Sequence, residues 1–210
     1  MGKQLPTAED CTKLMEHYEM LPNIREHSLI VASVAATLFT ALEKNIAEKL
    51  PDRELVIKGA MLHDIAKTIC LHGKCMHDVM GEKICLDHGY PDLAEIVKEH
   101  VYLEQYPERS WMDGIFQAKE IVFYADKRVN HDQLVSLSER LSYILKTYGQ
   151  KNKKREQFIM NNFFKCKKLE NALFSFIDFS PEILSSEPGD QFLSNLRAAE
   201  IIHHNVLTKK

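Results

Sequence analysis

Histidine and aspartate residues fall on the apolar faces of several predicted helices, where the presence of an ionisable side chain requires an explanation. His27 precedes Val31 and Val34 at helical spacing, so it shares their face of one helix. The same phase places further ionisable groups beside apolar residues, namely His63, Asp64, His77, His100 and Asp126. Imidazole and carboxylate together suit zinc, iron, manganese, nickel or cobalt. The pattern therefore predicts a metal site, although each histidine taken alone could instead be a hydrogen-bonded core residue.

The two aspartates strengthen the prediction of a metal site. An ionised carboxylate without a partner is strongly unfavourable in a dry interior. No arginine falls on the same predicted faces as Asp64 and Asp126, so the sequence shows no obvious protein counter-charge. A divalent cation would supply one. Because neighbouring residues on a helix are about 100° apart, His63 and Asp64 could grip one ion from adjacent rows of the same helix.

Helices are the elements predicted to position these groups. Apolar residues recur at helical spacing along nearly the whole chain, and glycine and proline are few. We predict an all-α fold, a compact multi-helix bundle, with helices over residues 8–20, 24–49, 52–69, 76–88, 91–104, 113–130, 131–148, 152–176 and 189–206. Gly149 and the basic run at 151–155 indicate a boundary between a domain at 10–149 and a C-terminal helical extension at 150–210. The basic run could equally be a solvated helix face.

Composition limits the class of protein. The chain has 210 residues, of which 45% are hydrophobic and 27% charged, so it is large enough to bury its own core. The net charge of −3 argues against a generic nucleic-acid-binding protein. The longest apolar stretch, residues 28–42, is shorter than the roughly 20 residues that span a bilayer, and residues 1–10 are polar. We predict a cytoplasmic protein without a membrane or nucleic-acid partner.

The cysteines predict a reduced protein. There are five of them, an odd number in a chain that is not small, so a disulfide framework is not expected. The segment from Cys70 to His77 also contains His72 and Cys75. It could hold a structural zinc ion or, alternatively, be a loop that carries two free thiols.

The order of these groups resembles the HD-domain superfamily of metal-dependent phosphohydrolases. The motifs that carry the resemblance are Arg25-Glu-His-Ser28, Leu62-His-Asp-Ile-Ala-Lys67, His77-Asp-Val-Met-Gly81, Lys98-Glu-His-Val101 and Tyr124-Ala-Asp-Lys127. The likeness spans about residues 20–148. It is closest to small bacterial members, including hydrolases of symmetric dinucleoside polyphosphates, but differs from those after His100, where they tend to have threonine and glycine. Residues 150–210 match no motif of the family.

The resemblance implies a ligand set for one or two ions. One ion would be bound by His27, His63, Asp64 and Asp126. A second ion would be bound by His77 and His100, with Asp64 bridging the two ions. The cofactor would be one or two divalent ions of iron, manganese, nickel, cobalt, zinc or magnesium, since these ligands do not discriminate strongly among such metals.

The implied activity is hydrolysis of a phosphoester or phosphoanhydride by a metal-activated water. Asp64 and Lys67 are the predicted catalytic residues. Lys67 and Lys127 would bind the phosphate of a small substrate, with a nucleotide as the expected one, and a homodimer is one possible assembly. Two alternatives stay open. Some HD proteins with the same six ligands are di-iron oxygenases, and the domain could also be a nucleotide-sensing module without catalytic activity.

Overall fold

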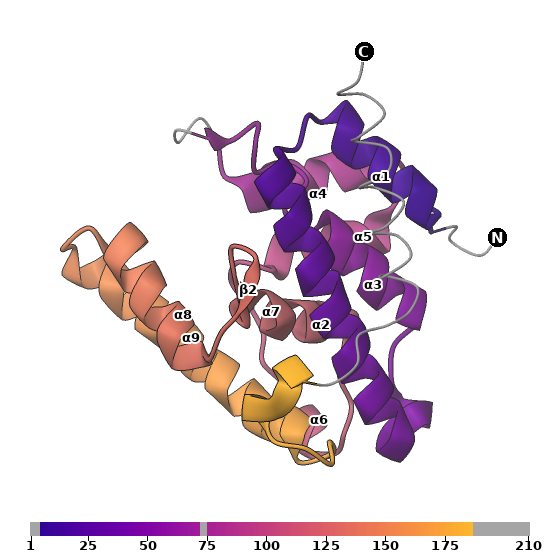
Figure 1. The fold of residues 1–210 in the computed structure, drawn as a ribbon, viewed down its shortest axis with the longest axis vertical. Helices are drawn as coiled ribbons and strands as arrows, with labels where there is room; N and C mark the ends of the chain where they lie inside the picture. The colour runs from indigo at the N-terminus through magenta and orange to yellow at the C-terminus, as the bar shows by residue number, and fades with distance from the viewer. Residues whose placement is uncertain (1–4, 72–74, 187–210) are drawn as a thin grey trace.

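The computed structural model describes residues 5–71 and 75–186, and α-helices dominate this part of the chain (Figure 1). The helices are, in order, α1 (Ala8–His17), α2 (Pro22–Ile46), α3 (Arg53–Leu62), α4 (His77–Asp87), α5 (Pro91–Glu99), α6 (Glu108–Met112), α7 (Ala118–Lys127), α8 (Leu137–Ile144) and α9 (Lys153–Phe174). Shorter elements are the 3-10 helices η1 (Ala47–Lys49) and η4 (Pro181–Ser186), the π-helix η3 (Leu145–Gly149), and the strands β1 (Val129–Asn130) and β2 (Gln133–Leu134). The prediction of an all-α fold is confirmed.

Most of these helices begin at a residue that suits a helix N-terminus. Thr7 and Ser136 cap α1 and α8, and in each case an acidic side chain three residues later bonds back to the backbone of the capping residue. The Asp52 carboxylate accepts two backbone N–H bonds from the first turn of α3. Pro22 and Pro91 open α2 and α5, where the missing N–H costs no hydrogen bond. These local signals explain why most predicted helix starts lie close to the observed ones; the exceptions are α7 and α8, which begin at Ala118 and Leu137 rather than at 113 and 131.

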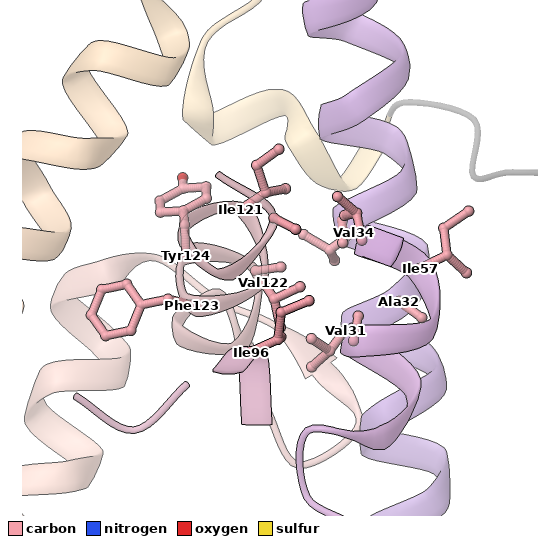
Figure 2. Packing of buried hydrophobic residues seen from close by; sticks show 14 of the residues in the cluster. Val31, Ala32, Val34, Ile57, Ile96, Ile121, Val122, Phe123 and Tyr124 are labelled. Carbon is pink, nitrogen blue, oxygen red and sulfur yellow. The ribbon is translucent and has the colours of Figure 1, made fainter. Parts of the chain in front are cut away.

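The long helix α2 lies at the centre of the bundle and packs against α3 and α7. Figure 2 shows Val31 and Val34 of α2 directed toward Ile121 and Val122 of α7, with Ile96 of α5 beside them. All five side chains are buried, and each contributes about 1.5–3 kcal/mol by leaving water. This packing fixes α2 and α7 against each other, and these two helices carry His27 and Asp126.

The hydropathy of α2 follows from its central position. Together with η1 it forms the one helix of the described residues, Pro22–Lys49, that is long and apolar enough to cross a membrane, which is longer than the apolar stretch recognised in the sequence. However, 61% of its most apolar window is buried inside the bundle. A long apolar helix that is mostly buried by its neighbours is the core helix of a bundle.

The helices on either side of the β-hairpin are shorter than predicted. Helix α7 ends at Lys127 and α8 begins at Leu137, and between them β1 and β2 pair Val129 with Leu134 and Asn130 with Gln133. At the hairpin turn His131 adopts a φ of 58°, which is incompatible with a right-handed helix. The prediction of a helix that starts at residue 131 is therefore wrong.

Helices α8 and α9 form a pair beside the bundle, and α9 packs on α6 and α7 (Figure 1). A buried polar network holds α9 in place. The Tyr124 hydroxyl donates to Glu170 Oε2 at 2.7 Å and accepts from Arg128 Nη1 at 2.6 Å. The boundary predicted at 149/150 falls in the turn between η3 and α9, and the helix predicted over 189–206 lies outside the described residues.

The segment between α3 and α4 contains a disulfide bond between Cys70 and Cys75. Because both sulfurs are used in the bond, the prediction of two free thiols is wrong, and the alternative of a zinc ion held by two thiolates does not apply. The turns after α3 bring the two Cα atoms to 4.8 Å, which is within the range that a disulfide requires. The remaining cysteines, Cys11, Cys85 and Cys166, are free and buried.

Candidate metal centre

The six predicted ligands converge on one region of the bundle. They lie in the second turn of α2 (His27), at the C-terminal end of α3 and just after it (His63, Asp64), at the start of α4 (His77), at the C-terminal end of α5 (His100) and in the last turn of α7 (Asp126). Two groups of possible metal ligands result, in each of which the ligand atoms lie within 4.8 Å of one another. The groups are His27, His63 and Asp64, and Asp64, His77 and His100.

The first group includes Asp126 as a fourth neighbour. Asp126 Oδ1 lies 3.1 Å from His27 Nε2 and 3.7 Å from His63 Nε2. Asp64 Oδ2 lies 3.4 Å from His63 Nε2 and 3.9 Å from His27 Nε2. All four residues are buried. Two imidazole nitrogens and two carboxylate oxygens thus face a common point.

The second group uses the other oxygen of the same carboxylate. Asp64 Oδ1 lies 3.4 Å from His77 Nε2 and 3.4 Å from His100 Nε2, and these two nitrogens are 3.2 Å apart. Asp64 therefore presents one oxygen to each pair of histidines. A carboxylate in this position can bridge two ions.

The spacing of these atoms suits metal coordination. Ligands bound at about 2.0–2.2 Å to a tetrahedral or octahedral ion are separated from one another by roughly 2.8–3.6 Å. The separations in the second group fall in this range, and those in the first group extend slightly beyond it. Only small side-chain shifts would be needed to close both groups around ions.

Hydrogen bonds to the backbone set the tautomer of three histidines. The Nδ1–H groups of His27, His63 and His100 donate to the carbonyl oxygens of His131, Ala60 and Val97, at 2.9, 2.7 and 2.6 Å. A carbonyl oxygen can only accept, so Nδ1 carries the proton and Nε2 keeps a lone pair. This is the partnership that orients histidine ligands in metal sites.

The same bonds explain why two predicted helices end early. The helix predicted over 52–69 ends at Leu62, and the one predicted over 91–104 ends at Glu99. At each end the following histidine caps a carbonyl oxygen three residues back, which satisfies one of the orphan acceptors of a helix C-terminus. His63 and Asp64 therefore lie in the turns that follow α3 rather than within the helix as predicted, although His63 keeps right-handed helical backbone angles.

Two buried atoms at the centre have no hydrogen-bond partner among the described residues. They are His63 Nε2 and Asp64 Oδ1. An unsatisfied buried polar atom costs about 1–3 kcal/mol, and these two lie where an ion would contact them. The donor set, the tautomers and these two atoms all fit a metal centre.

The buried carboxylates do have protein counter-charges, contrary to the expectation from the sequence. Lys67 Nζ lies 2.6 Å from Asp64 Oδ2, and Lys127 Nζ lies 2.7 Å from Asp126 Oδ2. Asp64 and Lys67 are three residues apart, a spacing at which side chains on a helical turn are neighbours. Because each carboxylate oxygen has two lone pairs, these lysines leave room for an ion. The histidines and the two unpartnered atoms, rather than a missing counter-charge, therefore indicate a metal.

Electrostatics favour the protonation states that a metal requires at Asp64, His77 and His100, whereas at His63 burial is outweighed by the neighbouring Asp64 carboxylate, which raises the pKa. Burial raises the pKa of Asp64, but Lys67 and His63 outweigh it and hold that pKa well below its ordinary value. Burial, and then the neighbouring His100 ring, lower the pKa of His77 to about 4. Burial likewise lowers the pKa of His100. At neutral pH the carboxylate is ionised and these two imidazoles are neutral, as metal binding demands.

The two predicted phosphate-binding lysines occupy different surroundings. The Lys67 side chain is 33% exposed, so its ammonium group lies at the edge of the centre. The Lys127 side chain is only 5% exposed, and its Nζ also donates to the carbonyl oxygen of His100 at 2.8 Å. Lys127 thus ties α7 to the end of α5 and orients Asp126, a position that does not suit direct contact with a substrate.

One residue beside the centre did not stand out in the sequence. Arg140 of α8 has Nη2 at 3.8 Å from Asp126 Oδ1, the oxygen that faces His27 and His63. The sequence around Arg140 does not mark it as a site residue. It follows Ser136 and Glu139, which cap the helix, in an ordinary amphipathic pattern. Only the fold of the β-hairpin brings α8 back toward the end of α7.

Comparison with protein families identifies the class of this protein. The HD domain family matches residues 24–143, which is more than half of the chain and includes all six converging side chains. The chain belongs to the HD domain family. HD domains form a superfamily of metal-dependent phosphohydrolases that bind divalent ions, and the His/Asp groups described above could hold such ions. Searches of curated proteins and of solved structures gave no significant match.

Proposed function

We propose that this protein is a phosphohydrolase with two metal ions, which cleaves a phosphoester or phosphoanhydride bond of a nucleotide or another small phosphorylated molecule. The observation that carries the proposal is the position of Asp64 between two pairs of histidine nitrogens, with Oδ2 toward one pair and Oδ1 toward the other. Metal pairs about 3.5–4 Å apart, linked in this way, suit in-line displacement at phosphorus.

Each converging side chain has a proposed role as a ligand. His27, His63 and Asp126 would hold the first ion, His77 and His100 would hold the second, and Asp64 would serve both. When bound, a pair of divalent ions lowers the pKa of a bound water and neutralises charge on the phosphoryl oxygens. Imidazole with carboxylate favours first-row ions, so iron, manganese, nickel, cobalt or zinc fit the donors better than magnesium does.

Lys67 has two proposed tasks. Its ammonium group holds Asp64 Oδ2 and thereby fixes the plane of the bridging carboxylate. Because a third of the side chain is exposed, the remaining N–H donors can meet a phosphate oxygen of a substrate that reaches the centre. A strongly hydrated point charge of this kind is a common phosphate contact.

The cations around the centre favour an anionic substrate over molecular oxygen. Lys67, Lys127 and Arg140 all lie within 4.0 Å of a carboxylate of the site. A phosphate group would gain from this positive field, whereas a neutral diatomic molecule would not. An oxygenase or a nucleotide sensor would each give a different result in the following test.

The test combines metal analysis with an activity panel on the full chain. Protein would be loaded separately with manganese, iron, nickel or magnesium, its metal content measured by mass spectrometry, and hydrolysis of nucleotides and simple phosphoesters followed by phosphate release. We expect up to two ions per chain and metal-dependent hydrolysis. Asp64→Asn should lose both ions and activity, whereas Asp87→Asn, which removes an exposed carboxylate paired with Lys83, should lose neither.

The same panel separates the alternatives. No phosphate release with any metal, together with a mixed-valent iron pair that consumes oxygen, would replace the hydrolase by an oxygenase. Tight nucleotide binding without turnover would replace it by a sensor. An Asp64→Asn protein that keeps its ions would overturn the proposed centre itself.

A further inference from the structure

The Arg140 guanidinium group lies beside the metal centre but takes no part in holding the six ligands. Its Nη1 donates to Asn130 Oδ1 at 2.7 Å, and the group also lies over the ring of Tyr143, with its central carbon 5.6 Å from the ring centre. The side chain is 11% exposed. Arg140 is therefore anchored by neighbours on the β-hairpin and on α8, and little rotamer freedom is left to lose when it binds a ligand.

The other edge of the same guanidinium group is not used within the described residues. Nε is buried and has no hydrogen-bond partner there. Nη2 is 3.8 Å from Asp126 Oδ1, which is beyond hydrogen-bond distance. In an arginine side chain Nε and Nη2 lie on one edge, and their N–H groups point the same way, so together they form the planar fork that matches two oxygens of a phosphate.

Asp126 cannot satisfy this fork. Its Oδ2 accepts from Lys127, and its Oδ1 faces His27 Nε2 at 3.1 Å. A purely structural arginine would be expected to close its second edge on a carboxylate or a carbonyl, as Arg128 does with Val135 and Pro181. The free edge of Arg140 instead lies next to the oxygen that faces the first group of ligands.

We infer that Arg140 is a phosphate-binding residue, whose Nε and Nη2 donate to two oxygens of the phosphoryl group that reaches the metal centre. The inference rests on the proposed function, because it concerns the substrate of the same site. The residue that recognises the charge of the phosphoryl group would then lie on α8, a helix that follows all six ligands in the chain. With Lys67 on one carboxylate and Arg140 beside the other, the phosphoryl group would lie between two cationic side chains.

Three variants of the full chain test this role. Arg140→Gln removes the charge and the fork but keeps a polar side chain, and Arg140→Lys keeps the charge without the fork. Arg155→Gln is the matched control, because Arg155 is an exposed arginine of the neighbouring helix α9 that contacts Gln150. Each protein would be loaded with manganese and examined for metal content, for binding of inorganic phosphate by calorimetry, and for kcat and KM on the best substrate found.

We expect Arg140→Gln to weaken phosphate binding roughly 10- to 100-fold, the usual effect of losing hydrogen bonds to a charged group. The metal content should stay as in the unmodified protein, and kcat/KM should fall by a similar factor. Arg140→Lys should recover part of the phosphate affinity, and Arg155→Gln should behave like the unmodified protein.

Two results would overturn the inference without touching the proposed function. In one, Arg140→Gln binds phosphate and turns over substrate normally. In the other, it loses manganese, which would make Arg140 a residue that positions Asp126. Absence of hydrolysis in the unmodified protein would instead count against the proposed function, while phosphate binding would still decide the role of Arg140.

Discussion

Gly81 is the position at which one added methyl group should separate the two halves of the second metal site. It lies on α4, and a Cβ atom there would be 2.5 Å from Val97 Cγ1 of α5. Ordinary contact begins near 3.4 Å, so in Gly81→Ala the two helices must move apart by roughly 1 Å. Val97 has no easy escape, because it is fully buried and its branched side chain is stiff.

This displacement acts directly on two proposed ligands. His77 begins α4, and His100, at the end of α5, donates its Nδ1–H to the Val97 carbonyl oxygen. Their Nε2 atoms are 3.2 Å apart. A shift of about 1 Å equals half the length of a metal–nitrogen bond. We expect the second ion to bind about 10- to 100-fold more weakly, as when the support of a ligand is lost.

The effect on stability should be small by comparison. Overpacking costs about 1–3 kcal/mol, and replacing glycine by alanine within a helix returns about 1 kcal/mol. We therefore expect Gly81→Ala to lower the free energy of unfolding by no more than about 2 kcal/mol. The variant should stay folded while its metal content falls.

Metal titration followed by mass spectrometry measures this loss, with the free energy of unfolding determined in urea. Val97→Ala in the Gly81→Ala background removes the clashing methyl group and should restore binding of the second ion, and Val97→Ala alone serves as the control. The reasoning would be refuted if Gly81→Ala bound two ions with unchanged affinity. It would also fail if the double variant bound the second ion no better than Gly81→Ala.

Three further predictions concern Lys67, the metal and the buried network. Lys67→Gln should keep its ions but lower kcat/KM about 10- to 100-fold, measured by steady-state kinetics; unchanged kinetics would show that Lys67 pairs with Asp64 but does not contact the substrate. Manganese at 100 times its dissociation constant should stabilise the chain by about 2.7 kcal/mol, seen as a rise in melting temperature that a chelator reverses. Tyr124→Phe should cost about 1–3 kcal/mol in urea unfolding, because the buried Glu170 and Arg128 each lose a partner; a stability equal to that of the unmodified protein would contradict this.

The disulfide bond lies within the chain segment that joins two parts of the centre. Lys67 precedes Cys70, and His77 follows Cys75. Counting cysteines in the sequence argued against a disulfide framework, and the three other cysteines are indeed buried thiols. Whether two particular thiols meet depends on the path of the chain between them, which the cysteine count does not contain.

The sequence by itself determined the helical class, most helix starts and the ionisable groups on apolar faces. Helical phase and capping are local properties, so neighbouring residues are enough to reveal them. This is why the fold class could be predicted correctly, and why the order of histidines and aspartates resembled that of HD domains before any distance was known.

Only the tertiary structure decided how these groups meet. His27 and Asp126 are 99 positions apart, yet their side chains come to 3.1 Å, and the turn at His131, predicted as helix, supplies the carbonyl that orients His27. The bridging position of Asp64 and the free edge of Arg140 likewise depend on how separate segments pack, whereas the lysine partners of the two carboxylates lie only three residues and one residue further along the chain. Helical phase fixes which way a side chain points from its own helix, whereas the distance between two helices is set by the volumes of all the side chains between them.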